Sequence, residues 1–158
     1  MTTIYVETSI IGYMTARSSD AVIFQARQQL TRQWWSTSRL NHRLVSSQLV
    51  IDEASAGDVT AAQERLQLLD GLPLLDVMHP DVQPLADQLL ANHLLPAKAA
   101  ADARHVAVAC VFGVDYLLTW NCKHIANAET LPRIYRMLRD LGFDPPLVVT
   151  PEEFSGNV

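Results

Sequence analysis

The chain has 158 residues, of which 49% are hydrophobic and 18% are charged, so it can bury a substantial core and is not a disordered segment. Its formal charge of −5 argues against broad nucleic-acid binding through net charge, although a local basic rim remains compatible with it. No apolar run reaches the roughly 20 residues of a membrane span, the first residues show no secretory signal, and two cysteines are no disulfide framework. We therefore expect one domain over residues 1–158, in the cytoplasm and not at a membrane.

The first expected strand runs from Thr3 to Val6, a short segment of β-branched and aromatic residues. Glu7 follows it directly, and Thr8 or Ser9 can cap the next helix through a side-chain oxygen. The helix dipole alone favours an acid at such a helix start, so Glu7 has a purely structural explanation. It also stands at the carboxyl end of a strand, where open parallel sheets bind ligands, and is therefore a candidate site residue.

Amphipathic helices and short strands alternate through the middle of the chain. We expect helices over residues 20–38, 60–69 and 80–93, and strands over residues 44–46 and 72–77. In the helix that Ser46 or Ser47 can cap, Leu49 and Glu53 lie four residues apart and share a face. An acid on the apolar side of a helix is costly unless something pairs with it. Glu53 is therefore a candidate site residue, and Asp52 is the solvent-facing neighbour.

A helix, a tight stop and a buried strand follow one another after Pro96, which suits a first helical turn. An apolar stripe at helical spacing predicts the helix: Ala99, Ala103, Val106, Ala107 and Cys110. Gly113 suits a left-handed helix end, and the apolar run from Val114 to Thr119 is typical of a strand buried on both faces. Asp102 flanks the stripe, and Asn121 falls just past the strand, at the expected binding edge.

The chain closes with a helix over residues 134–141, a turn, and a strand from Leu147 to Val149. Residues 150–153 are expected to cap a final turn. Strands alternate with helices throughout, without internal repeats or linkers, which predicts an α/β sandwich around a mainly parallel sheet with right-handed crossovers.

The candidate site residues are Glu7, Glu53, Asp102 and Asn121. Carboxylate, carboxamide and water oxygens suit hard divalent cations such as Mg²⁺ or Mn²⁺. Acids gathered in one cleft repel each other without a cation, and with one bound the cluster can polarise a phosphodiester and generate hydroxide. Scattered polar residues are also common in any domain of this size. His105 lacks the converging His or Cys residues of a zinc site, so we interpret it as a packed histidine or one that supports the site.

Basic side chains near the candidate site are few. Lys98 and Lys123 are the only two lysines, and with Arg17 and Arg104 they can form a rim that meets RNA phosphates. Chance placement is the alternative interpretation. No Gly-rich phosphate loop accompanies them.

Four segments together resemble the PIN-domain family over nearly the whole chain: YVETSII near the start, SQLVIDE, DARHVAVA and GVDYLLTWN. The chain is similar in particular to the single-domain, toxin-type ribonucleases of bacterial toxin–antitoxin pairs (VapC-like). The resemblance implies a three-layer α/β/α sandwich with a mainly parallel central sheet, and an endoribonuclease that depends on Mg²⁺ or Mn²⁺. Matched by motif, the four acidic positions of the family fall on Glu7, Glu53, Asp102 and Asn121, with Glu7, Asp102 and Asn121 as metal ligands. An RNA substrate, a cognate antitoxin and a homodimer are implied as partners.

Two positions depart from the family pattern. Glu7 replaces the usual Asp and is one methylene longer, and Asn121 replaces a frequent Asp and removes a charge. These changes leave open a second hypothesis, a PIN-fold module that binds RNA or protein without cleaving. A third hypothesis, an aspartyl-phosphate protein, needs an Asp nucleophile after a strand, which residues 7–9 do not supply.

Overall fold

The computed structural model describes residues 1–154, and the last four residues of the predicted domain lie outside this range. The strands are β1 (Thr3–Val6), β2 (Arg43–Ser47), β3 (Leu74–Leu75), β4 (Tyr116–Leu118) and β5 (Leu147–Val149). The α-helices are α1 (Thr8–Thr15), α2 (Val22–Ser36), α3 (Gln48–Ala54), α4 (Val59–Leu69), α5 (Val82–Ala91), α6 (Ala100–Val111) and α7 (Leu131–Asp140). Two short 3₁₀ helices span Ser38–Asn41 and Ala97–Ala99.

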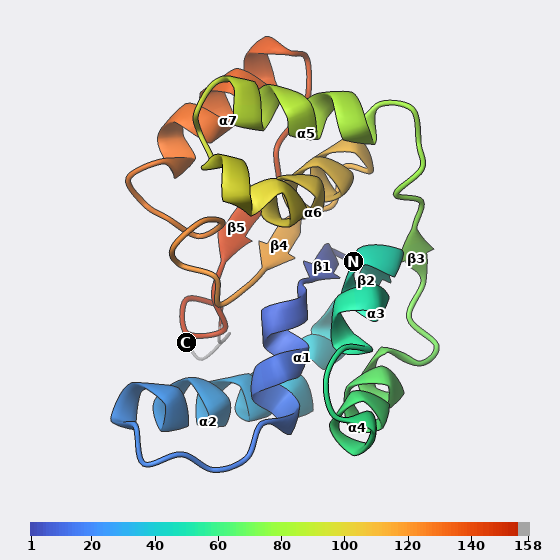
Figure 1. Ribbon diagram of the computed structural model, residues 1–158, viewed down its shortest axis with the longest axis vertical. Helices are drawn as coiled ribbons and strands as arrows, with labels where there is room; N and C mark the ends of the chain where they lie inside the picture. The colour runs from blue at the N-terminus through green and yellow to red at the C-terminus, as the bar shows by residue number, and fades with distance from the viewer. Residues whose placement is uncertain (155–158) are drawn as a thin grey trace.

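The five strands form one parallel sheet in the order β3-β2-β1-β4-β5. Figure 1 shows α5, α6 and α7 on one side of this sheet and α1 to α4 on the other, so the molecule is a three-layer α/β/α sandwich. The predicted fold class is confirmed. Among residues 1–154, no helix has the length and apolar composition that crossing a bilayer requires.

Burial is greatest in the centre of the sheet. Ile4, Tyr5 and Val6 of β1 are fully buried, as are Leu117 and Leu118 of β4, because helices cover both faces of these two strands. In α6, every residue from His105 to Cys110 is also buried, since the helix packs between the sheet and α5. The predicted apolar stripe of this helix is therefore correct in position but narrower than the surface that the helix buries.

Some element boundaries differ from the prediction because a proline or a side-chain hydrogen bond ends the regular backbone pattern early. Strand β3 has two residues instead of the six expected, because Pro73 has no N–H for the ladder and the Asp76 carboxylate accepts the Met78 N–H at 2.9 Å to begin a turn. The segment after Pro96 begins with a 3₁₀ turn, and the α-helix starts at Ala100. The closing turn is capped as predicted, since Thr150 and Glu153 exchange side-chain-to-backbone hydrogen bonds.

The sheet topology places two strand ends at one crevice. The chain runs outward from β1 through β2 to β3 and then returns to the other side of β1 with β4, so the strand order reverses between β1 and β4. In open parallel sheets, ligands bind in the crevice outside the carboxyl ends of the strands at such a reversal. Glu7 directly follows β1, and Asn121 lies three residues after the end of β4.

Candidate metal centre

Glu7 is the most firmly held acid at this crevice. It is only 4% exposed, and its Oε2 accepts hydrogen bonds from the Ser9 N–H at 3.1 Å, from the Thr119 hydroxyl at 2.7 Å and from the Ser9 hydroxyl. Glu7 itself, and neither Thr8 nor Ser9, is therefore the N-cap of α1, which corrects the sequence-based assignment. Within residues 1–154, its Oε1 accepts no hydrogen bond, so this oxygen is available to a cation.

A chain of hydrogen bonds orients Glu53 from inside the core. Its Oε1 lies 2.5 Å from Nε2 of His105, and Nδ1 of that fully buried histidine lies 2.7 Å from the Tyr5 hydroxyl. The Tyr5 hydroxyl in turn lies 2.7 Å from the Ser47 hydroxyl. Both ring nitrogens of His105 are thus engaged within the protein, which leaves the histidine to fix the carboxylate in place.

Among the described residues, Glu7, Glu53 and His105 form a cluster at which a cation could bind, with the two carboxylates as ligands and His105 holding Glu53 in place. One ligand atom from each lies within 4.8 Å of the other two, although the residues are 46 and 52 positions apart in sequence. The cluster draws on the end of β1, on α3 and on α6. Two carboxylates this close to one another are the chemistry that a hard divalent cation stabilises.

Asp102 and Asn121 lie beside this cluster and contact each other. Asp102 is half-buried in the first turn of α6, and a hydrogen bond from Asn121 and the charge of Glu53 both act on its carboxyl. Asn121 Oδ1 also accepts the His124 N–H at 3.0 Å. Among the described residues, the set within 4.8 Å does not include Asp102, so the four predicted site residues form an inner pair and an adjoining pair.

The pKa values of the two half-exposed acids are shifted in opposite directions. Burial raises the pKa of Asp102, against smaller lowering effects of His105, His124 and Asn121. Burial also acts to raise the pKa of Glu53, but the hydrogen bond and charge of His105 outweigh it and hold that pKa below its usual value. Repulsion from neighbouring acids therefore does not set the direction of the pKa shift of Glu53, because His105, whose partner could not be assigned from the sequence, outweighs it.

An additional oxygen lies at the centre. The Thr8 hydroxyl oxygen is buried and makes no hydrogen bond of regular geometry with the described residues, although it is close enough to Glu53 to help lower that pKa. Thr8, Tyr5 and Thr119 were not predicted as contributors to the site. The only signal in the sequence is that a hydroxyl inside a buried strand or at its end needs a partner.

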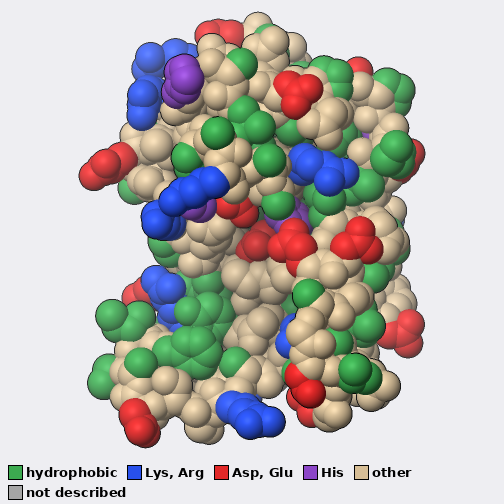
Figure 2. All heavy atoms as spheres, in the orientation of Figure 1, with side chains coloured by type: hydrophobic (Ala, Val, Ile, Leu, Met, Phe, Trp, Pro, Cys, Tyr) green, Lys and Arg blue, Asp and Glu red, His purple; other side chains and the backbone are tan. Residues whose placement is uncertain are grey.

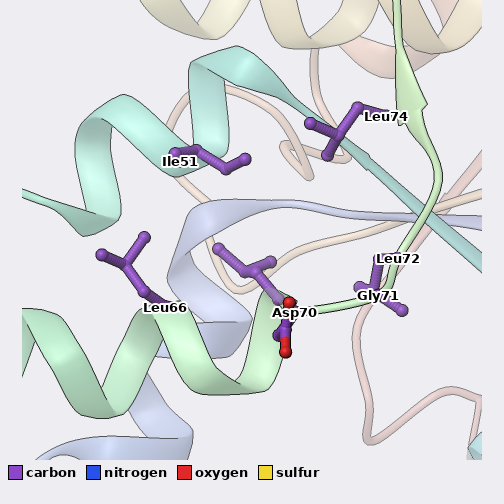
Figure 3. A pocket seen from close by; sticks show the side chains of 7 residues that line it. Ile51, Leu66, Asp70, Gly71, Leu72 and Leu74 are labelled. Atoms are coloured by element: carbon purple, nitrogen blue, oxygen red, sulfur yellow. The ribbon is translucent and has the colours of Figure 1, made fainter.

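Acidic side chains gather near the middle of the face shown in Figure 2, with Lys, Arg and His side chains beside them. A separate hollow lies away from this centre, at the sheet edge formed by β3, and is shown in Figure 3. Its lining is mostly apolar, with Ile51, Leu66 and Leu74 facing it and Asp70 at its rim. With this lining, the sheet-edge hollow offers no set of ligands for a cation.

Comparisons with known proteins bear on the fold. No protein-family model matches the sequence, and no curated protein sequence matches it. Among solved structures, the chain is similar to one in the crystal structure of VapBC2 from Rickettsia felis bound to a DNA fragment from their promoter. The TM-score is 0.58 and the sequence identity 14%, over 94% of this chain and 98% of that chain. At this identity, the likeness shows a shared fold.

Proposed function

We propose that this protein is an endoribonuclease that depends on Mg²⁺ or Mn²⁺, and that it is the toxin of a type II toxin–antitoxin pair. The observation that carries the proposal is the cluster of Glu7, Glu53 and His105 within 4.8 Å at the point where the strand order reverses, with Asp102 and Asn121 adjoining it. The likeness of the fold to a chain of VapBC2 supports the toxin–antitoxin setting.

The donor set fits a hard divalent cation. Glu53 is oriented by a buried histidine. Within the described part of the chain, Glu7 has one carboxylate oxygen without a hydrogen bond, and the Thr8 hydroxyl oxygen lacks a regular one. Cysteine is absent from the cluster, and the one histidine has both nitrogens engaged, which argues against a zinc centre. When bound, the cation would supply positive charge that polarises the phosphodiester and lowers the pKa of a coordinated water.

The protein's own residues would position the reactants. In hydrolysis, a bond forms between the water oxygen and phosphorus, the bond from phosphorus to one ribose oxygen breaks, and that leaving oxygen takes up a proton. Glu7 and Glu53 would fix the centre, because Ser9, Thr119 and His105 hold them rigidly. Asp102 and Asn121 would orient the attacking water from the adjoining position.

The remaining parts of the proposal concern assembly and setting. Residues 1–158 would form one domain that acts as a homodimer in the bacterial cytoplasm. A cognate antitoxin would bind it and hold it inactive. A short open reading frame directly upstream of the gene, overlapping it or nearly so, would support this pairing.

The decisive test is RNA cleavage by purified protein with Mn²⁺ or Mg²⁺. We expect the wild type to cleave single-stranded or structured RNA, and we expect Asp102→Asn to lower the rate about 100-fold or more because the water loses its positioning. Asp52→Asn is the matched control, since Asp52 is exposed and its carboxylate accepts a hydrogen bond from Gln48 at 2.8 Å. Cleavage that persists in excess EDTA or in Asp102→Asn would contradict the proposal.

One observation favours the second candidate function, a PIN-fold module that binds RNA or protein without cleaving it. The Oδ1 of Asn121, the only ligating oxygen of its side chain, already accepts the His124 N–H, so one of its two lone pairs is left for a cation. A protein that binds RNA with the same affinity in Mn²⁺ and in EDTA, and that cleaves none of it, would support this function.

A further inference from the structure

A hollow whose charged lining residue is Lys123 lies next to Asp102 and Asn121. The loop between α5 and α6 and the loop after β4 form its walls, with His93, Lys123, His124, Asn127 and Thr130 among its lining residues. Its volume is about 270 Å³, slightly below the about 300–1,000 Å³ of pockets that enclose a drug-sized ligand. The hollow therefore has room for a small group such as a phosphate.

The charge of this hollow is opposite to that of the whole molecule. The chain carries 17 acidic and 12 basic residues, yet none of the described residues that line the hollow is Asp or Glu. Lys123 is exposed, and it forms no ion pair with any residue in the range 1–154. A lysine of this kind attracts an anion without first giving up an internal partner.

The loop that carries Lys123 is held in place by its own side chains. The Asn127 amide donates to the Lys123 carbonyl oxygen at 3.0 Å, and its Oδ1 accepts the Glu129 N–H at 3.0 Å. The Thr130 hydroxyl donates to the Asn127 carbonyl oxygen at 3.2 Å, and Ile125 is fully buried beneath the loop. Lys123 therefore projects from a pre-organised backbone, which lowers the cost of ordering this loop on binding.

The hollow and the candidate metal centre share a wall. The His124 N–H donates to Oδ1 of Asn121 at 3.0 Å, so a residue that lines the hollow contacts a residue that adjoins the centre. A polyanion that places one phosphate at the acids would thus have a neighbouring phosphate near the hollow. Because cationic groups that contact phosphates fix the register of a nucleic acid, the hollow is placed to set which linkage reaches the acids.

We propose that the hollow formed by His93, Lys123 and His124 is a subsite for a backbone phosphate of single-stranded RNA, next to the phosphate that the acidic centre receives. This inference rests on the proposed function, because it takes the acidic centre as the cleavage site. It assigns to Lys123 a role in positioning the substrate, separate from the acids.

The test measures binding of a short single-stranded oligoribonucleotide by fluorescence anisotropy, in Ca²⁺ and over a series of salt concentrations. We expect Lys123→Gln to weaken binding about tenfold and to reduce the slope of log K against log salt by about 0.7, the value for one lost contact with a single strand. Arg43→Gln is the matched control: it removes the same charge from an exposed residue at the start of β2, at the amino end of the strands. We expect the control to bind within about twofold of the wild type, since solvent screens distant charges.

A second measurement locates the contact on the RNA. Oligonucleotides that carry one neutral methylphosphonate at successive positions should reveal a linkage whose neutralisation weakens the wild type but leaves Lys123→Gln unchanged. Undetectable wild-type binding, equal losses in Lys123→Gln and Arg43→Gln, or additive effects at every linkage would overturn the subsite.

The subsite and the nuclease fail in distinguishable ways. Cleavage by the wild type in Mn²⁺, with no effect of Lys123→Gln on binding, would overturn the subsite and leave the nuclease standing. Lys123-dependent binding at one linkage without cleavage would overturn the nuclease and show an RNA-binding module instead. Thermal melting of both variants checks that they fold.

Discussion

The two carboxylates of the candidate metal centre, Glu7 and Glu53, are held by different sets of hydrogen bonds. Oε2 of Glu7 takes three hydrogen bonds from groups at the end of β4 and the start of α1, so its position follows from the backbone. Glu53 depends on one buried histidine, whose other nitrogen depends on Tyr5. A buried polar chain of this kind is stable only while each member keeps its partner. Glu53 should therefore be more sensitive than Glu7 to substitutions in the core.

Asp102→Asn should stabilise the metal-free protein at neutral pH, by no more than a few degrees in Tm. The folded-state pKa of Asp102 lies above its ordinary value of 3.8, mainly because of burial. The native state therefore binds the proton more tightly than the unfolded state, and stability falls as pH rises from 3.8 through the raised pKa. Thermal melting in EDTA should show the variant gaining on the wild type over this pH window, with a constant difference above it. A gain that grows toward lower pH would contradict the assigned shift.

The opposite change at the neighbouring position, Asn121→Asp, is the control for the predicted gain in metal-free stability. It places a second carboxylate against Asp102, so repulsion should lower Tm in EDTA. It should also tighten Mn²⁺ binding, because a carboxylate is a stronger ligand than a carboxamide for a hard cation. The two variants should thus move metal-free stability in opposite directions.

Gly113 forms the tight turn that connects α6 to β4. Helix α6 ends at Val111, and the Gly113 N–H reaches the Cys110 carbonyl oxygen at 3.1 Å. Gly113 has φ +62°, which turns the chain back so that the next N–H, from Val114, reaches the Ala109 carbonyl oxygen at 3.2 Å. This left-handed turn sends the chain directly into the central sheet, and so it sets where Asn121 emerges.

Gly113→Ala should destabilise the protein by about 1 kcal/mol, or about 2–4 °C in Tm, through backbone strain alone. An added Cβ at Gly113 would meet nothing within 4 Å, so steric clash does not contribute. Gly12→Ala is the matched control: it also has open space around it, but it lies inside α1, where Ala is favoured by about 0.5–1 kcal/mol. Chemical denaturation should give opposite signs for the two variants, and a shared sign would show that the turn is not the reason.

At the scale of the whole molecule, the reversal of strand order decides where the acids meet. Glu7, Glu53 and Asp102 come from three crossover units of the chain, and the order of the parallel strands brings the end of β1, the last turn of α3 and the first turn of α6 to one crevice. A cation in this crevice would link elements from both helical layers. Its binding should therefore raise the free energy of unfolding of the entire sandwich and not of one layer alone.

Millimolar Mn²⁺ or Mg²⁺ should raise Tm of the wild type. A ligand at 100 times its dissociation constant adds about 2.7 kcal/mol to the free energy of unfolding, which is about 5–11 °C for a chain of this size. Glu7→Gln should abolish most of the gain, since it removes a ligand charge, whereas Glu152→Gln, at an exposed site near the C-terminus, should keep it. Equal melting of the wild type with and without either cation would contradict the metal centre.

The sequence by itself determined the class of fold. Alternating apolar runs and amphipathic stretches predicted the parallel α/β sandwich, and the limits of β1 and β5 agree with the structure. Strand β1 is buried, as its continuous apolar run predicts, whereas β5 lies at the sheet edge with Leu147 exposed. The same patterns identified Glu7 and Asn121 as residues that follow strands. Their roles, and those of Glu53 and Asp102, stay predictions.

Only the tertiary structure decided which polar groups pair, because hydrogen-bond partners distant in sequence leave no periodic signal. His105 lies 100 residues from Tyr5 and 52 from Glu53, yet it joins the two and lowers the pKa of that acid. The N-cap of α1 is likewise Glu7, since the hydroxyl of Thr119, the residue that follows β4, helps to hold its carboxylate in the capping position. Local propensity favours certain capping residues and hydrogen-bond partners within one segment, but contacts between distant segments determine which of them form.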